Sequence, residues 1–310
     1  MVRPNSHGAR ESTMDRRRII KNIVGLGITG IAATKWPEAL FADDMATRIA
    51  AKNEAVSNSS VPKPGKPPEL LPEPAETSTG KVSNLQIARQ LIAQANDRMS
   101  RVNDYTCTFI KQERIGKKLL PPQTILMKGR TNPHSIYFSF QTVHKGREAI
   151  YFPAKFSNKL VAHEGGWTGY LAGTMQLDPL GRLAMSDNRH PVSEAGINKL
   201  VARVHDSWHH HLQPEHDITI ERGLSLANRS STLVQTKHDI RSPQFQYHMV
   251  QIFFDDELGL PVRFVGFDWP SAPGQPPQML EDYQFVNLRL NTGLTNLDFD
   301  PANPAYAYKK

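Results

Sequence analysis

Two runs of large apolar residues, separated by a polar turn, stand out along residues 247–269. In the first half of this stretch, one face carries His248, Val250, Ile252 and Phe254, and the other carries Tyr247, Met249, Gln251 and Phe253. Three acids and a glycine follow at 255–259, which is turn chemistry, and the second half then extends from Val262 to Phe267. The pattern predicts a β-hairpin. Because both faces hold large apolar side chains, we expect at least part of its sheet to be covered on both sides.

The same period of two recurs along much of the chain and predicts further strands at 105–114, 124–129, 135–140, 149–152, 159–163, 218–222, 233–238 and 280–290. Helical spacing of apolar residues predicts two helices, at 85–102 with Ser83 as N-cap and at 191–212. The segment 171–190 carries no periodic pattern. Consecutive strands joined by short turns favour an antiparallel sheet, so the predicted class is α+β. We expect one strongly curved antiparallel sheet from Tyr105 to Leu290, with the helices on its concave side.

The N-terminus has the pattern of an export signal. Paired arginines, Arg16 and Arg17, precede two aliphatic residues, a lysine and the short apolar run 23–33. Eleven apolar residues are too few to cross a membrane as a helix, but they suit a secretory signal. The arginine pair resembles the twin-arginine export motif, although Asp15 and Ile19 depart from it. We therefore expect a signal peptide at 1–42, the twin-arginine machinery as a partner, and a mature chain without a transmembrane helix in the periplasm or outside the cell.

Proline recurs through residues 43–80 among serine, lysine and glutamate, which predicts an extended, disordered linker. The remaining residues, 81–310, then form the curved-sheet domain. The 310-residue chain has a net charge of +7, but residues 1–42 carry seven basic and three acidic side chains. This leaves only +3 for the rest, which lacks a basic stripe, and we expect no nucleic-acid partner. The single cysteine, Cys107, is predicted to be a small core residue.

Several residue groups could carry chemistry, and each is incomplete. His205 and His209 lie four apart on a predicted helix and could share a metal, but no HExxH glutamate and no third ligand accompany them. The alternative is a polar helix end, where imidazoles suit the helix dipole. The run GLSLA at 223–227 lacks the last glycine of a nucleophile elbow. The runs at 163–164 and 187–190 hold acids and bases that loops commonly carry, and the acid pair at 281–282 is predicted to expose one side chain. The sequence favours a non-catalytic protein without a cofactor.

The chain also resembles a known family. The stretches that carry the resemblance are YTCTFIKQER, KGREAIY, AHEGGW, LDPLGRLAM, NRHPVSEAGI, DDELGLPVRF, YQFVNLRLN and LDFDPANPAY. Over about 85–308 they resemble an uncharacterised exported bacterial family, best known from planctomycetes and described only as a domain of unknown function. More distantly, the layout resembles the LolA/LolB-like periplasmic lipoprotein carriers. That resemblance implies an incomplete antiparallel barrel whose apolar concave face, covered by helices, accepts acyl chains. No functional residue of the carriers matches a position here.

Adjacent predicted strands each offer one apolar row to the concave face. We expect these rows to line a ligand site made of Phe109, Ile125, Met127, Ile136, Phe138, Phe140, Val250, Ile252, Phe254 and Phe264. The sequence therefore predicts a non-catalytic carrier of an apolar ligand, a lipid or a lipoprotein acyl chain. Three alternatives stay open. The helices could fill the hollow as a closed core, or the protein could be a secreted hydrolase or metal-dependent enzyme, or a structural interaction protein of the envelope.

Overall fold

The computed structural model describes residues 83–166, 173–213 and 216–308. The predicted signal peptide and the predicted linker lie outside the described residues, so both stay predictions. Within the described residues, no helix is long and apolar enough to span a lipid bilayer.

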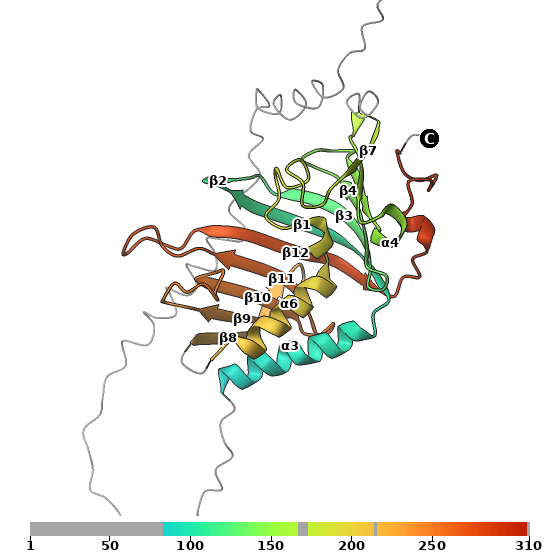
Figure 1. Cartoon of the computed structure of the whole chain (residues 1–310). Helices are drawn as coiled ribbons and strands as arrows, with labels where there is room; N and C mark the ends of the chain where they lie inside the picture. Colours follow the sequence, from blue (N-terminus) through green and yellow to red (C-terminus); the bar gives the residue numbers. More distant parts are fainter. Residues whose placement is uncertain (1–82, 167–172, 214–215, 309–310) are drawn as a thin grey trace, which may run out of the picture. The chain divides into compact units, whose positions relative to one another are not determined.

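One twelve-stranded antiparallel sheet organises the described part of the chain, as the sequence predicted (Figure 1). Its strand order is β7-β6-β5-β4-β3-β1-β12-β11-β10-β9-β8, and β2 pairs with β1 beside this path. The strands are β1 (Asp104–Ile115), β2 (Lys118–Leu119), β3 (Gln123–Arg130), β4 (Ser135–Phe140), β5 (Glu148–Tyr151), β6 (Leu160–His163), β7 (Thr174–Leu177), β8 (Asp217–Leu226), β9 (Arg229–Lys237), β10 (Met249–Asp255), β11 (Leu260–Phe267) and β12 (Met279–Leu290). The hairpin predicted from the alternation at 247–269 is β10–β11, with Ile252 opposite Phe264.

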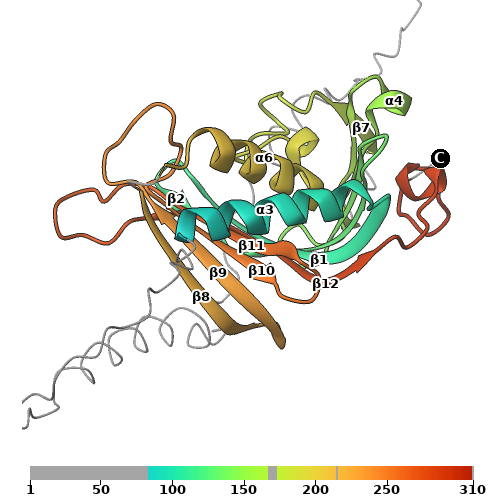
Figure 2. The same cartoon turned by 90° about the horizontal axis from the view of Figure 1, so that it is seen from below.

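The sheet curves around two helices, α3 (Asn84–Ser100) and α6 (Ile197–His210), which pack against each other on its concave side (Figure 2). A reciprocal capping box starts α3: Ser83 Oγ accepts from the Gln86 backbone N–H at 3.2 Å, and the Gln86 side chain accepts from Ser83 N–H at 3.0 Å. Arg89 of α3 donates to backbone carbonyls at the end of α6, including Leu212 O at 2.7 Å. These donations satisfy acceptors that a helix C-terminus leaves free.

The start of α6 corrects the predicted helix at 191–212. Residues Val192–Glu194 form a 3₁₀ turn and Ala195 is extended, so the α-helix begins only after Gly196. The backbone of Gly196 has φ = 110°, which side chains disfavour, and an added Cβ would lie 2.4 Å from the Tyr105 hydroxyl. The close approach of the buried Tyr105 therefore fixes where the helix starts. Its apolar stripe is confirmed, with Ile197, Leu200, Val201, Val204 and Trp208 buried.

Two short strands were not predicted. The first, β7, lies in the segment expected to be irregular and pairs with β6. The second, β2, lies between the predicted strands at 105–114 and 124–129 and pairs with the end of β1. Neither contains a fully buried residue, so no apolar alternation marks them in the sequence.

The hydrophobic core has two parts. The larger lies between the concave face and the two helices and includes Cys107, which is buried as expected. Burial raises the pKa of its thiol to about 12, which keeps it protonated. A smaller cluster lies behind β4–β6, where the C-terminal segment packs: Tyr306 stacks on Tyr137 at 4.1 Å between ring centroids. The motif LDFDPANPAY therefore packs the C-terminal segment against the outer face of β4–β6.

Candidate functional site

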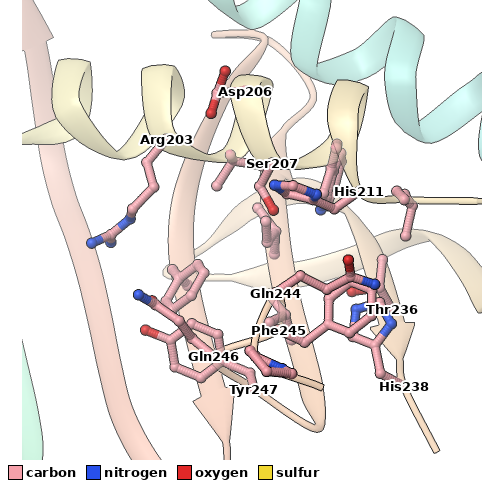
Figure 3. A pocket seen from close by; sticks show the side chains of 17 residues that line it. Arg203, Asp206, Ser207, His211, Thr236, His238, Gln244, Phe245, Gln246 and Tyr247 are labelled. Carbon is pink, nitrogen blue, oxygen red and sulfur yellow. The ribbon is translucent and has the colours of Figure 1, made fainter. Parts of the chain in front are cut away.

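A cavity of about 280 Å³ lies between α6, the strands β9–β11 and the loop 239–247 (Figure 3). Its volume lies just below the range of typical ligand pockets in proteins, which is about 300 to 1,000 Å³.

Apolar side chains form the inner part of the cavity wall. Val204, Trp208 and Leu212 come from successive turns of α6 and the residues just beyond it, while Val250, Ile252 and Phe264 come from the sheet. The spacing of four residues places the three helix residues on one face. This wall offers an environment in which an aliphatic chain loses contact with water.

Polar side chains also line the cavity, from both sides. The helix side contributes Arg203, Asp206, Ser207 and His211, and the opposite side contributes Thr236, His238, Gln244 and Gln246 (Figure 3). Arg203 forms a long ion pair with Glu194, at 3.9 Å, and its guanidinium lies 5.8 Å from the centroid of the Phe264 ring. An apolar wall with polar groups around it suits a molecule that has both an aliphatic part and a polar part.

The ten residues predicted to line a ligand site all join the main core under the helices. Three of them, Val250, Ile252 and Phe264, line the cavity. Five others, Phe109, Ile125, Met127, Ile136 and Phe254, are buried in the core, and Phe138 and Phe140 pack against it half-buried. The helices therefore cover most of the concave face, and open space remains where α6 meets β9–β11.

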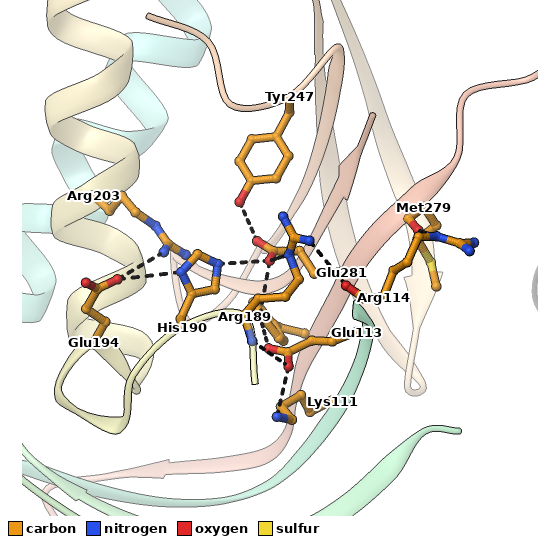
Figure 4. Close-up of polar contacts among 11 residues, drawn as sticks. Lys111, Glu113, Arg114, Arg189, His190, Glu194, Arg203, Tyr247, Met279 and Glu281 are labelled. Atoms are coloured by element: carbon orange, nitrogen blue, oxygen red, sulfur yellow. Dashed lines mark hydrogen bonds and ion pairs between the residues drawn. The ribbon is translucent and has the colours of Figure 1, made fainter. Parts of the chain in front are cut away.

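Next to the cavity lies a buried network of charged groups centred on Glu281 of β12 (Figure 4). The carboxylate of Glu281 is fully buried and accepts hydrogen bonds from Tyr247 at 2.6 Å, from Arg189 at 2.9 Å and from Tyr283 at 3.2 Å. His190 Nε2 lies 2.9 Å from the same carboxylate. Burial alone would raise the pKa of Glu281, but the hydrogen bonds and charges of its partners, His190 first, outweigh it and hold the pKa at about 2.

A second buried carboxylate, Glu113 of β1, completes the network. It accepts from Lys111 Nζ at 3.1 Å, from the backbone N–H of Arg189 at 3.1 Å and from the Tyr283 hydroxyl, which it shares with Glu281. Every oxygen of the two carboxylates thus has a donor. The network fastens the segment 188–190 to the sheet, and Tyr247, which also lines the cavity, joins the two features.

Sequence reasoning missed this network, although part of its signal was present. The inward alternation of Tyr105, Cys107 and Phe109 continues to Lys111 and Glu113, which therefore point into the concave side. For the acid pair on β12, the expectation that one residue faces water fails. Glu281 is buried, and Asp282 is largely buried too, in an ion pair with Arg263 at 2.7 Å.

The other predicted chemical groups stay apart from the cavity. His205 and His209 share a face of α6 as predicted, with ring centroids 4.1 Å apart. Among the described residues, no three side chains of His, Cys, Asp or Glu converge as metal ligands would. The run GLSLA lies in the exposed strand β8 and leads into β9, not into the helix that a nucleophile elbow requires.

Comparison with known proteins places this architecture in a family. The model of the family described as "Protein of unknown function (DUF1571)" matches residues 102–308. No curated protein matches the sequence.

Solved structures similar to the chain include lipoproteins and a member of the LolA superfamily, the group to which the sequence layout was likened. Lipoprotein LppX of Mycobacterium tuberculosis is 10% identical with a TM-score of 0.40, over 69% of this chain and 98% of the other. LprF from Mycobacterium bovis is 12% identical with a TM-score of 0.39, over 67% and 95%. The LolA superfamily protein from Nitrosomonas europaea is 7% identical with a TM-score of 0.29, over 69% and 97%.

Proposed function

The chain belongs to the DUF1571 family of proteins of unknown function, and we propose that it is an exported, non-catalytic protein that binds or carries an apolar ligand in the cell envelope. The ligand class is a lipid or a lipoprotein acyl chain. The observation that carries the proposal is the cavity between α6 and β9–β11, with its apolar inner wall and polar surround.

The energetics of this cavity suit an aliphatic chain. Each methylene moved out of water contributes about 0.8 kcal/mol, so a few buried methylenes give appreciable affinity without a charged anchor. A wall of valine, isoleucine, leucine and aromatic rings supplies that burial, while Arg203, Gln244 and Gln246 can contact the polar end of a lipid.

A hydrolase is the alternative function, because two neighbouring carboxylates could act as catalytic acid and base. A catalytic acid or base has to reach its substrate, within about 3 Å or through one water. Glu113 and Glu281 are 3% and 0% exposed, neither lines the cavity, and all their oxygens accept hydrogen bonds from the protein. This geometry supports a structural role for both carboxylates.

Placement in the envelope rests on the sequence of the N-terminus. If the twin-arginine route exports the chain, replacing Arg16 and Arg17 by lysine keeps the charge but removes the recognised pair. We expect the wild-type chain in the envelope fraction and the doubly substituted chain in the cytoplasm. Export of the substituted chain at the normal level would exclude this route.

The cavity can be tested by filling it. Ser207 lines the cavity from α6, and Ser207→Phe should occupy the space of at least two ligand methylenes. At about 0.8 kcal/mol each, this weakens the binding of a fluorescent fatty acid by about tenfold or more. The matched control is Ala202→Phe, on the same helix at an exposed position outside the cavity. Equal loss in both variants, or no saturable binding by the wild type, would contradict the proposal.

A further inference from the structure

The loop 239–247 forms one wall of the cavity and is held at few points. Pro243, Gln244, Phe245 and Gln246 line the cavity, whereas Ile240 is 81% exposed. At its C-terminal end the loop is anchored, because the Tyr247 hydroxyl donates to Glu281 at 2.6 Å. The Tyr247 ring also lies against Gly266, where an added Cβ would approach it to 2.6 Å. Nearer its start, Arg241 pairs with Asp268 on the surface at 2.8 Å.

Between these points, one aromatic contact closes the loop over the cavity. The ring of Phe245 stacks on His238 with centroids 3.8 Å apart and planes 11° from parallel. His216 packs edge-on against both rings, at 5.2 Å from Phe245 and 4.5 Å from His238. We call these three rings the clasp.

His238 is nine-tenths buried and lines the cavity. Its Nδ1 atom is buried and has no hydrogen-bond partner among the described residues. A buried polar atom without a partner costs about 1–3 kcal/mol, and the cost rises steeply if the ring becomes charged. The clasp therefore depends on a neutral imidazole.

Among the described residues, no carboxylate forms an ion pair or a hydrogen bond with the His238 ring. The titratable and charged groups around it are His216 just before β8 and Asp217 at its first position, Lys237 and Asp239 on either side of it in the chain, His248 just before β10, and Asp206 and His211 at the end of α6, which line the same cavity. Asp239 pairs with Lys237 at 2.8 Å, and Asp206 pairs with His210 at 3.1 Å. Burial, followed by the neighbouring His216 and His248, lowers the pKa of His238 to about 4.

We propose that the loop 239–247 is a gate over the cavity and that protonation of His238 opens it. An imidazolium would gain about 0.5–2 kcal/mol from the face of the Phe245 ring. The cost of keeping one unpaired charge buried is several kcal/mol, so burial decides the outcome and the clasp separates. If the proposed function holds, the gate is where an apolar ligand enters and leaves, and exchange is faster at acidic pH.

The direction of the pH effect follows from the two states. In the open loop His238 has an ordinary pKa of about 6.5, whereas in the closed loop it is about 4. The ratio of the closed to the open loop is therefore at its maximum above pH 6.5 and falls about tenfold for each pH unit between 6.5 and 4. Between pH 7 and pH 5 the expected loss is about 20-fold.

Hydrogen–deuterium exchange of the full mature chain tests the gate without any ligand. After correction for the intrinsic exchange rate, protection of amides in 238–248, such as Phe245 N–H bonded to Ser242 O, should fall about 20-fold from pH 7 to pH 5. Amides of β1 and β12 should keep their protection, which shows that the sheet stays folded. In His238→Phe, which keeps an aromatic ring in the clasp, the loop should stay closed at both pH values.

The matched control is His205→Phe, at a histidine of α6 that does not line the cavity; it should respond to pH as the wild type does. If the protection of the loop amides in the wild type does not change with pH, the gate is excluded. This outcome does not depend on whether any variant folds. An undiminished response in His238→Phe overturns it as well. A loop that opens in acid on a protein that binds no fatty-acid probe leaves the gate standing and removes the proposed function.

Discussion

Charged residues inside the curved sheet were the hardest positions to interpret from the sequence. Alternation along β1 correctly predicted that Cys107 and Phe109 point inward. In the structure the same alternation continues to Lys111 and Glu113, which are buried on the same face. What the sequence could not supply was the reason for burying charges there. Their partners, Arg189 and Tyr283, lie 76 and 170 positions from Glu113. Only the folded chain brings these groups within hydrogen-bonding distance.

Glu281 provides a test at this scale. Its folded-state pKa of about 2 lies below the ordinary value of 4.5, so its contribution to stability is present above about pH 4.5 and is lost as pH falls toward 2. The size of the shift corresponds to about 3 kcal/mol. Glu281→Gln should lower the free energy of unfolding at pH 7 by about 3 kcal/mol, because Arg189 and His190 lose a buried anion.

Urea denaturation of the wild type and of Glu281→Gln at pH 7 and at acidic pH measures this contribution. The difference between the two proteins should shrink as the pH falls below 4.5, since protonation removes the charge in the wild type too. Glu221→Gln, at an exposed position of β8, is the control and should change stability by less than about 0.5 kcal/mol. An unfolding free energy of Glu281→Gln equal to that of the wild type at pH 7 would show that the network contributes no stability.

Elements were predicted best where apolar residues recur with a clear period along the chain. The strands β1, β3, β4 and β10–β12 and the helix α3 follow from periodicity, and Ser83 caps α3 as predicted. The two short strands and the start of α6 did not follow, for different reasons. Polar edge strands such as β7 bury too few apolar side chains to leave a hydrophobic pattern in the sequence. The helix start depends on Gly196 making room for Tyr105, a residue 91 positions earlier.

The loop 239–247 illustrates the same limit for function. Its sequence has no regular pattern, and the prediction of a ligand site rested on apolar strand residues alone. The structure adds the loop and α6 as the other walls of the cavity. The contact that closes the loop joins Phe245 to His216, just before β8, and to His238, just after β9, and no local motif encodes it.

On the scale of the whole domain, the curved antiparallel sheet with two helices on its concave side was predictable from the order of elements. How far the helices fill the hollow was not, because it depends on side-chain volumes across surfaces far apart in the sequence. The structure lies between the two expectations: a packed core under most of α3 and α6, and a cavity at the β9–β11 end. We therefore expect one aliphatic chain, or part of one, in this cavity.

Native mass spectrometry of the mature protein, purified from the envelope of its own host without detergent stripping, tests that expectation most directly. We predict a species bound to the purified protein that organic solvent extracts as a lipid. Its occupancy should fall in Ser207→Phe and persist in Ala202→Phe. A wild-type protein that shows no bound species in the mass spectrum, yields no lipid on extraction and binds no fluorescent fatty acid would contradict the proposed function.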